Sequence, residues 1–363
     1  WRSEFADDSS FFSKNVSLIS ITGGILDTVL PADYTIIEDI IPYTNGFTTY
    51  TTTIPGVWTP VDHLAVVWCD QLRRVIAKLL LEMVDVTSPA KTYPLEKRMT
   101  LSRKLLLSGL EDYAVQDYNV FGPNNEAIRT LDSFEDTIEI KPNAKLVIKS
   151  DTIQSYSAYS IFNIPDKSEE LQFSVLTSLD KLPIYFCQKS LMKMNFSDGS
   201  NEQKLKCVSA TDDLITIPKS VEGINTIIPS SLDGEKKYFK VLNLNATVLA
   251  KYDFISLETP KKSEIQGNFL IAELTTLESV KTVNKNMFSM LANGVRLSHE
   301  ELGASSSIST IRFPNLWSSL ISYKMKVNYS SKDLIFQPLI RQWVERPFET
   351  KWHLAASGDS FRI

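Results

Sequence analysis

The sequence predicts an α/β portion over residues 1–113, followed by an all-β domain over residues 114–363. In the first region, a β-branched strand ends at a glycine pair, and a long apolar segment with helical spacing follows it. In the second region, short β-branched segments recur between turn signals, which is typical of a β-sandwich or jelly-roll-like domain. A chain of 363 residues with 43% hydrophobic residues can fill both cores.

The first expected element is the strand "VSLISIT" at residues 16–22, which ends at Gly23 and Gly24. Residues 25–60, which include "NGFTTYTTTIPG", are polar and rich in threonine. We expect them to form an extended loop with little regular structure.

A long helix is expected after this loop. Thr59 suits the N-cap, Pro60 suits the first helical position, and Asp62 completes a T-x-x-D capping box. The apolar side chains that follow have helical spacing and indicate packing against a large core. They are Leu64, Val67, Trp68, Leu72, Val75, Ile76, Leu79, Leu80 and Met83.

The region after Tyr113 contains expected strands such as "DTIEIKPNAKLVIKS", "LQFSVLTSL" and "YFKVLNLNATVLAKYDFISLE". Pro-Asn and Asp-Gly pairs separate several of these segments. The strand lengths do not repeat at a fixed period, which disfavours a propeller or a solenoid.

Charge and hydropathy exclude some classes of function. The net charge of −5 and the pI of about 5.5, with no basic stretch interleaved with aromatics, argue against a nucleic-acid partner. No segment reaches the ~18 apolar residues of a membrane-spanning helix. The first ten residues, "WRSEFADDSS", lack a start methionine and the apolar core of a signal peptide. We therefore expect the chain to be a piece of a longer protein.

The three cysteines indicate no metal site, because no CxxC pair or Cys/His set occurs. Cys69 lies inside the apolar segment and is expected to be a buried free thiol. Cys187 and Cys207 lie in a strand-rich region, and the sequence leaves open whether they form a disulfide. No metal or organic cofactor is expected.

Four N-glycosylation triplets favour a secretory-pathway protein. They begin at Asn15, Asn195, Asn245 and Asn328.

The residues with the clearest chemical pattern are Asp27 and His63. Asp27 follows the expected strand, and His63, one of three histidines, precedes the expected helix. In α/β-hydrolases the catalytic triad runs in the order Ser, Asp or Glu, His, with the acid after a late strand and the histidine before the last helix. An imidazole must take the proton of the serine hydroxyl, and a carboxylate must fix the tautomer of that imidazole. Asp27 and His63 are therefore the candidate acid and base.

Other acids nearby have simpler interpretations. Asp62 is expected to cap the helix, since a negative charge is favourable at a helix amino terminus. Asp33, Glu38 and Asp39 are expected to be solvated loop residues.

The segments "SLISITGGILDTVLPADYT" and "GFTTYTTTIPGVWTPVDHLAVVWCDQLRRVIAKLL" resemble the GPI inositol-deacylase family, and most closely its fungal branch. The resemblance is dense over residues 16–113 and looser over the β-rich remainder. It implies a lipase-like α/β-hydrolase of the endoplasmic reticulum membrane, with this portion on the lumenal side and a lumenal β-domain after the hydrolase. Transmembrane helices follow in the family.

The implied reaction is hydrolysis of the ester that joins a fatty acyl chain to the inositol of GPI anchors, which favours export of the anchored protein. The implied partners are GPI-anchored proteins, their acylated inositol lipid and, through segments absent here, the membrane. His63 matches the family's catalytic histidine and Asp27 its triad acid. The family's nucleophile lies in a G-x-S-x-G, and no such pentapeptide occurs in these residues. The isolated chain is therefore expected to be inactive.

A different class of function stays open for the β-rich region. It could be a lumenal binding module for glycan or GPI-anchored protein, or a scaffold for the hydrolase that recruits the anchored protein. Aromatic side chains that could stack on a sugar are Tyr156, Tyr159, Trp317 and Trp343, although such residues more often form the core.

Overall fold

The computed structural model describes most of the chain and places it in two compact units. Unit 1 comprises Trp1–Asp117, Thr216–Lys236 and Tyr323–Ile363, and unit 2 comprises Tyr118–Ile215 and Lys237–Ser322. The described residues are 2–24, 27–89, 91–111, 126–130, 136–149, 158–165, 171–193, 203–219, 238–276, 280–298, 307–316, 322–328, 338–344, 349–354 and 360–362.

Two parallel strands lie in unit 1. β1 (Leu18–Thr22) pairs in parallel with β2 (Gly46–Tyr50). β1 confirms the expected strand, but β2 lies where a loop was expected, so that prediction was wrong. All five residues of β2 are buried, and the Thr49 hydroxyl donates to the carbonyl oxygen of Leu106 at 2.8 Å. The threonines therefore serve as β-branched strand residues, with a hydroxyl satisfied inside the unit.

The long helix, α3, spans Asp70–Glu82, so the helix start predicted at Thr59 was wrong. The segment before it is held by the end of β1, because the carbonyl group of Val61 packs directly against Gly23. A helix that began at Thr59 would draw Val61 away from this contact.

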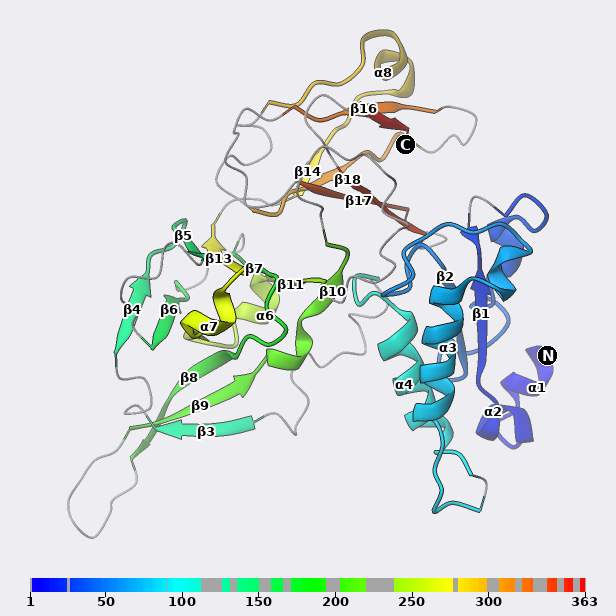
Figure 1. The fold of residues 1–363 in the computed structure, drawn as a ribbon, viewed down its shortest axis with the longest axis horizontal. Coiled ribbons are helices and arrows are strands. Elements are labelled where there is room, and N and C mark those ends of the chain that lie inside the picture. Colours follow the sequence, from blue (N-terminus) through cyan, green and yellow to red (C-terminus); the bar gives the residue numbers. More distant parts are fainter. Residues whose placement is uncertain are drawn as a thin grey trace. The chain divides into compact units, whose positions relative to one another are not determined.

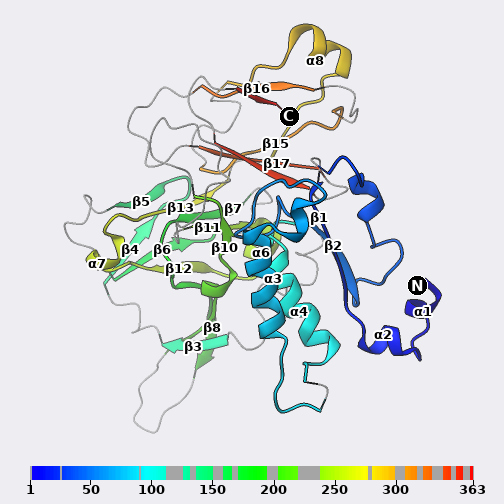
Figure 2. The same cartoon turned by 45° about the vertical axis from the view of Figure 1, so that its right-hand side comes forward.

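The core of unit 1 is formed by Leu72 and Leu79 of α3, Phe47 of β2 and Met99 of α4 (Leu95–Leu106). Burial of each such side chain contributes about 1.5–3 kcal/mol to folding. Figures 1 and 2 show α3 and α4 side by side, next to the β1–β2 pair.

The predicted apolar face of the helix is only partly right. Leu64, Val67 and Trp68 precede α3 and are exposed, and Leu80 on α3 is exposed as well.

The other elements of unit 1 are short. They are α1 (Arg2–Ala6), α2 (Phe11–Asn15), the 3-10 helices η2 (Ala32–Thr35) and η3 (Ala65–Val67), the antiparallel pair β16 (Lys324–Lys326) and β19 (Ser360–Arg362), and the antiparallel pair β17 (Leu339–Trp343) and β18 (Thr350–Leu354).

Unit 2 is a β-sandwich, as the sequence predicted. One sheet has the order β10-β11-β7-β13-β5 and the other the order β3-β9-β8-β12-β6-β4; β9 is labelled in Figure 1 and β12 in Figure 2. The strands of the first sheet are β10 (Ile215–Ile217), β11 (Phe239–Asn245), β7 (Gln172–Thr177), β13 (Phe269–Thr275) and β5 (Lys145–Lys149); β10 spans the point at which the unit assignment changes, after Ile215. Those of the second are β3 (Glu126–Thr130), β9 (Gln203–Ser209), β8 (Ile184–Lys193), β12 (Phe254–Glu258), β6 (Tyr159–Asn163) and β4 (Thr137–Ile140).

Three phenylalanine rings join the two sheets through the core. Phe173 of β7 lies edge-on to Phe162 of β6 and to Phe186 of β8, with ring centroids 5.4 and 5.9 Å apart. All three are fully buried. Edge-to-face pairs add about 0.5–1.5 kcal/mol beyond the burial of their area, so these contacts fix how the sheets stack.

Cys187 of β8 and Cys207 of β9 lie opposite each other and form a disulfide. Both are fully buried and pack with Leu205 and Phe254. Cys69 is a half-buried free thiol.

The remaining elements of unit 2 lie outside the two sheets. They are α6 (Ala246–Leu249), α7 (Lys262–Ile265), α8 (Met287–Asn293), the 3-10 helix η6 (Thr211–Asp213) and the parallel pair β14 (Val280–Thr282) and β15 (Thr310–Arg312).

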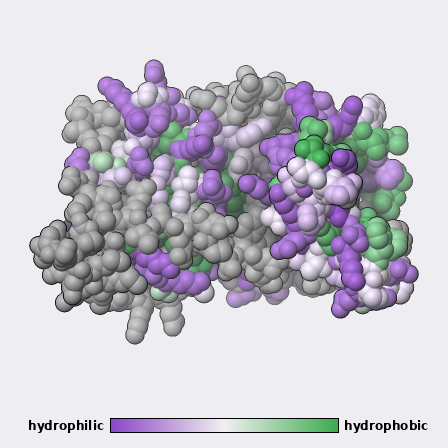
Figure 3. Space-filling view, turned by 90° about the horizontal axis from the view of Figure 1, so that it is seen from below, coloured by the Kyte–Doolittle hydropathy of each residue, from purple (hydrophilic) through white to green (hydrophobic). Residues whose placement is uncertain are grey.

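Hydrophobic side chains also reach the surface. Figure 3 shows them in green among purple hydrophilic residues. Within the described segments, no helix has the length and hydropathy needed to cross a membrane.

Candidate active site

The site begins at the end of β1, where two glycines let two loops approach each other. A side chain at Gly23 would collide with the carbonyl oxygen of Val61. Gly24 has φ = +76°, a conformation that side chains disfavour. Because Val61 precedes His63 by two residues, this contact brings the histidine loop to the loop that follows β1.

Asp27 is held by the backbone of its own loop. Its N–H donates to the carbonyl oxygen of Gly24 at 2.9 Å, and its Oδ1 accepts from the N–H groups of Val29 (3.1 Å) and Leu30 (2.8 Å). The carboxylate is buried, with 7% of the residue exposed. The Leu30 N–H, with smaller contributions from His63 and Val29, holds the pKa of Asp27 below its ordinary value, although burial opposes this shift. Asp27 is thereby kept ionised.

The second oxygen of Asp27 binds His63. Oδ2 lies 2.9 Å from Nδ1 of His63, a residue 36 positions later in the chain. Since an ionised carboxylate only accepts hydrogen bonds, Nδ1 carries the proton, and Nε2 of the neutral ring is then a free base. Within the described part of the chain, Nε2 has no hydrogen-bond partner. The imidazole is 42% exposed, so a substrate can reach it.

Asp62, the acid nearest to His63 in the sequence, binds backbone N–H groups rather than the imidazole. Its Oδ1 accepts from the N–H groups of Leu64 and Ala65, both at 2.9 Å. It therefore caps the short 3-10 turn rather than the long helix, because α3 begins only after Cys69.

The remaining acids of the loop do not join the pair. Glu38 accepts from the N–H and hydroxyl groups of Thr48 and so braces the start of β2. Asp33 and Asp39 are exposed, as expected of loop residues.

Exposed hydrophobic side chains flank both members of the pair. Val29 and Leu30 follow Asp27, and η3 carries Val67 in the turn after His63. These residues, together with Leu64 and Trp68, are between 39% and 77% exposed. We call the five residues the apolar rim.

A C-terminal segment that the sequence did not connect with this site also contacts it. Glu349 fills the space that a side chain at Gly24 would occupy. The next residue, Thr350, donates its N–H to Oγ1 of buried Thr53 at 3.2 Å. No pattern in the sequence could have shown this, because Glu349 belongs to no motif and lies far along the chain from Gly24.

The other sequence candidates are separate from the pair. Asn15, Asn245 and Asn328 are exposed, and Oδ1 of Asn245 caps α6, whereas Asn195 lies outside the described residues. In the part of the chain that is described, no group of three or more His, Cys, Asp or Glu residues could hold a metal ion.

Of the candidate sugar-stacking residues, Tyr159 packs against the cluster around the disulfide, and Trp343 is 37% exposed. Tyr156 and Trp317 lie outside the described residues.

Two family models match the chain. A model of the PGAP1-like alpha/beta domain matches residues 1–83, and a model of the GPI inositol-deacylase beta-sandwich domain matches residues 130–274. The first match contains Asp27 and His63, and the second lies within unit 2 except for residues 216–236, which belong to unit 1. An α/β domain followed by a β-sandwich domain is thus found by both comparison and structure.

Curated fungal proteins are similar over almost all of the chain. The GPI inositol-deacylase of Eremothecium gossypii is 45% identical over 360 residues, which are 98% of this chain and 35% of that protein. The GPI inositol-deacylase of Kluyveromyces lactis is 38% identical over 365 residues, or 100% of this chain and 35% of that protein. That of Debaryomyces hansenii is 37% identical over 94% of this chain and 36% of that protein. The chain spans about a third of the length of these relatives.

Proposed function

The chain belongs to the GPI inositol-deacylase family, and from this premise we propose that it forms part of an ester hydrolase. The reaction is hydrolysis of the ester between a fatty acyl chain and the inositol ring of a GPI anchor. The observation that carries the proposal is the hydrogen bond between buried, ionised Asp27 and exposed His63.

In the proposed mechanism, His63 acts through Nε2. It takes the proton of a serine hydroxyl as the serine attacks the ester carbonyl, and it then gives that proton to the departing inositol oxygen. Water next attacks the acyl-serine, with His63 again as base; the bond between the acyl carbon and the serine oxygen breaks, His63 returns its proton to that oxygen, and the fatty acid leaves. Asp27 keeps His63 in the tautomer with the proton on Nδ1, and it stabilises the imidazolium that forms in each step.

We propose that the nucleophilic serine of this mechanism lies outside the 363 residues, because they contain no G-x-S-x-G. We therefore propose that the isolated chain has no deacylase activity. It supplies the acid and the base of a site that other residues complete.

An α/β-hydrolase fold for the first portion is supported by where the two residues lie. Asp27 follows β1 and His63 follows β2, and these strands are parallel. The carboxyl ends of neighbouring parallel strands meet at one edge of a sheet, which is where catalytic groups of open α/β sheets gather. The boundary after residue 113, between this portion and the β-rich portion of residues 114–363, stays a proposal.

A lipid substrate is supported by the apolar rim. An acyl chain near His63 would replace water on Val67 and Trp68, which are now exposed, and such burial is favourable. We further propose that GPI-anchored proteins are the partners, that hydrolysis promotes their export, and that this portion faces the lumen of the endoplasmic reticulum. The exposed sequons at Asn15, Asn245 and Asn328 agree with a lumenal position.

The test is release of the inositol-linked acyl chain by the full-length protein. His63→Ala is expected to lower the rate by about 10⁴-fold or more, because the serine loses its base. His353→Ala is the matched control, since the His353 ring contacts Gln342 of β17 rather than Asp27. Normal deacylation by the His63 variant, at equal expression, would refute the assignment.

A further inference from the structure

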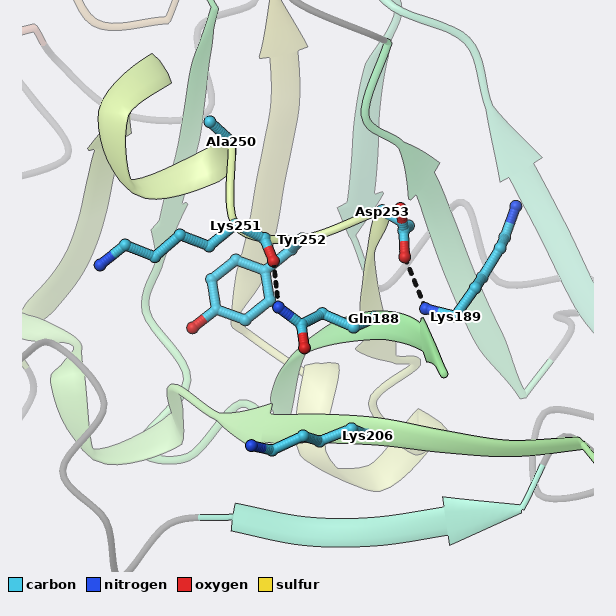
Figure 4. A pocket seen from close by; sticks show the side chains of 7 residues that line it. All are labelled: Gln188, Lys189, Lys206, Ala250, Lys251, Tyr252 and Asp253. Carbon is cyan, nitrogen blue, oxygen red and sulfur yellow. Dashed lines mark hydrogen bonds between the residues drawn. The ribbon is translucent and has the colours of Figure 1, made fainter. Parts of the chain in front are cut away.

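A second site is suggested by a pocket of about 330 Å³ in the β-sandwich unit. It is lined by Gln188 and Lys189 of β8, by Lys206 of β9 and by residues 250–253 after α6 (Figure 4). None of these residues belongs to the Asp27–His63 site.

The wall of the pocket is held by contacts inside the sandwich. The N–H of Asp253 donates to the carbonyl oxygen of Cys187 at 2.9 Å, and the side-chain amide of Gln188 donates to the carbonyl oxygen of Lys251. The ring of Tyr252 packs on buried Phe186, with centroids 5.4 Å apart. These contacts fix the wall of the pocket, which lowers the entropic cost of binding a ligand there.

The charges around the pocket favour an anion. Three lysines and one carboxylate line it, and the carboxylate of Asp253 accepts a hydrogen bond from the backbone N–H of Lys189. Neither Lys189 nor Lys251 forms an ion pair with any residue that the structure describes. This excess of positive charge is local, because the chain as a whole carries −5.

Some of the donors also share a direction, whereas the side chain of Lys189 extends to the upper right in Figure 4, away from them. In Figure 4 the ammonium groups of Lys206 and Lys251 and the hydroxyl group of Tyr252 all extend toward the left of the view, with the amide of Gln188 between the two lysines. Ammonium groups bind phosphate oxygens as point charges, and hydroxyl and amide groups add neutral hydrogen bonds.

We propose that this pocket binds a phosphate group of the GPI headgroup. The inference rests on the proposed function for the identity of the ligand, since a GPI anchor is a phosphorylated glycolipid. A pocket open to solvent suits a phosphate that stays attached to a large glycan. The sandwich thereby helps to hold the substrate, while the ester is cleaved elsewhere.

The experiment measures binding without catalysis. Full-length protein carrying His63→Ala is mixed with the water-soluble glycan–inositol phosphate headgroup of a GPI anchor, freed from its lipid. Adding Lys206→Gln and Lys251→Gln is expected to raise the Kd about tenfold or more, because each change removes a charged contact. The matched control is Lys181→Gln with Lys262→Gln, two exposed lysines of the same unit outside the pocket.

Two further arms identify the source of the phosphate. The same headgroup, once enzymatically dephosphorylated, should bind with equally low affinity to the Lys206→Gln, Lys251→Gln variant and to the Lys181→Gln, Lys262→Gln control. Vesicles of phosphatidylcholine, with or without phosphatidylserine, should bind both variants alike. If the Lys206→Gln, Lys251→Gln variant loses only vesicle binding, the proposal is overturned in favour of a membrane-surface contact. If the Kd of that variant for the headgroup is unchanged, the proposal is overturned outright. Thermal unfolding of each variant shows that the sandwich is intact.

The result is separable from the proposed function of the Asp27–His63 pair. If His63→Ala still deacylates but headgroup binding depends on Lys206 and Lys251, the catalytic assignment fails and the phosphate site stands. If His63→Ala is inactive but the lysine changes have no effect, the reverse holds.

Discussion

Replacing Asp27 by asparagine tests the candidate site most directly, because it changes one atom of the carboxylate and little else. Oδ1 of the asparagine can still accept from the N–H groups of Val29 and Leu30, so the loop should keep its shape. In the wild type, Nδ1 of His63 lies 2.9 Å from Oδ2 of Asp27, which accepts its hydrogen bond. In the variant, the amide nitrogen would replace Oδ2 and would present an N–H to Nδ1 instead. The imidazole would then have to carry its proton on Nε2, where the serine needs a base.

The expected loss in kcat is about 10⁴-fold, the effect of the wrong tautomer on an intact triad. KM should stay within about threefold, since Asp27 is buried and does not meet the substrate. The assay is acyl release by full-length protein at equal expression. Asp62→Asn is the matched control, because it removes the same charge one residue from His63 but only loosens the cap of a 3-10 turn. Activity of Asp27→Asn above a tenth of wild type, or an equal loss in both variants, would refute the reasoning.

Three further predictions concern stability. Phe173→Ala should cost about 3–5 kcal/mol in urea unfolding, because it empties the centre of the sandwich, whereas a loss below about 1 kcal/mol would mean that the rings do not join the sheets. Serine at both Cys187 and Cys207 should cost about 3 kcal/mol, the loop-closure value for a separation of 20 residues, and the control is the serine variant of free Cys69. Burial raises the pKa of Asp213 to about 6, with a smaller contribution from Asp212. The native state therefore holds that proton more tightly than the unfolded chain, so its stabilising effect should fade as the pH rises from about 4 to about 6, and Asp213→Asn should flatten this part of the stability–pH curve.

The pair itself could be found from the sequence, because its pattern is local. A strand, a glycine turn and an acid mark Asp27, and a helix-capping signal in front of a long apolar segment marks His63. The distance between them could not be derived, since it depends on the contact of Gly23 with the carbonyl group of Val61. The same contact explains why the helix begins later than the sequence predicted. Thr59 carries a good capping signal, but tertiary packing overrides it.

The β-sandwich followed from the alternation of its strands, but the order of its sheets did not. β7 pairs with β11 and β13, which are distant in sequence, and alternation says which face of a strand is buried without naming its neighbour. β2 was missed because both of its faces are buried, so "GFTTY" shows no alternation of polar and apolar residues. Its threonines are polar, which is why the segment was predicted to be a loop.

The assignment of residues 323–363 to the same unit as residues 1–117 has a consequence for biosynthesis. The ribosome releases the first segment well before the second, with roughly 200 residues between them, which at about 5–20 residues per second takes about 10–40 s. During that interval Thr53 and the glycine turn beside Asp27 lack the segment that contains Glu349 and Thr350. The sandwich can close first, and the Asp27–His63 pair gains the support of Glu349 and Thr350 only when those residues have emerged.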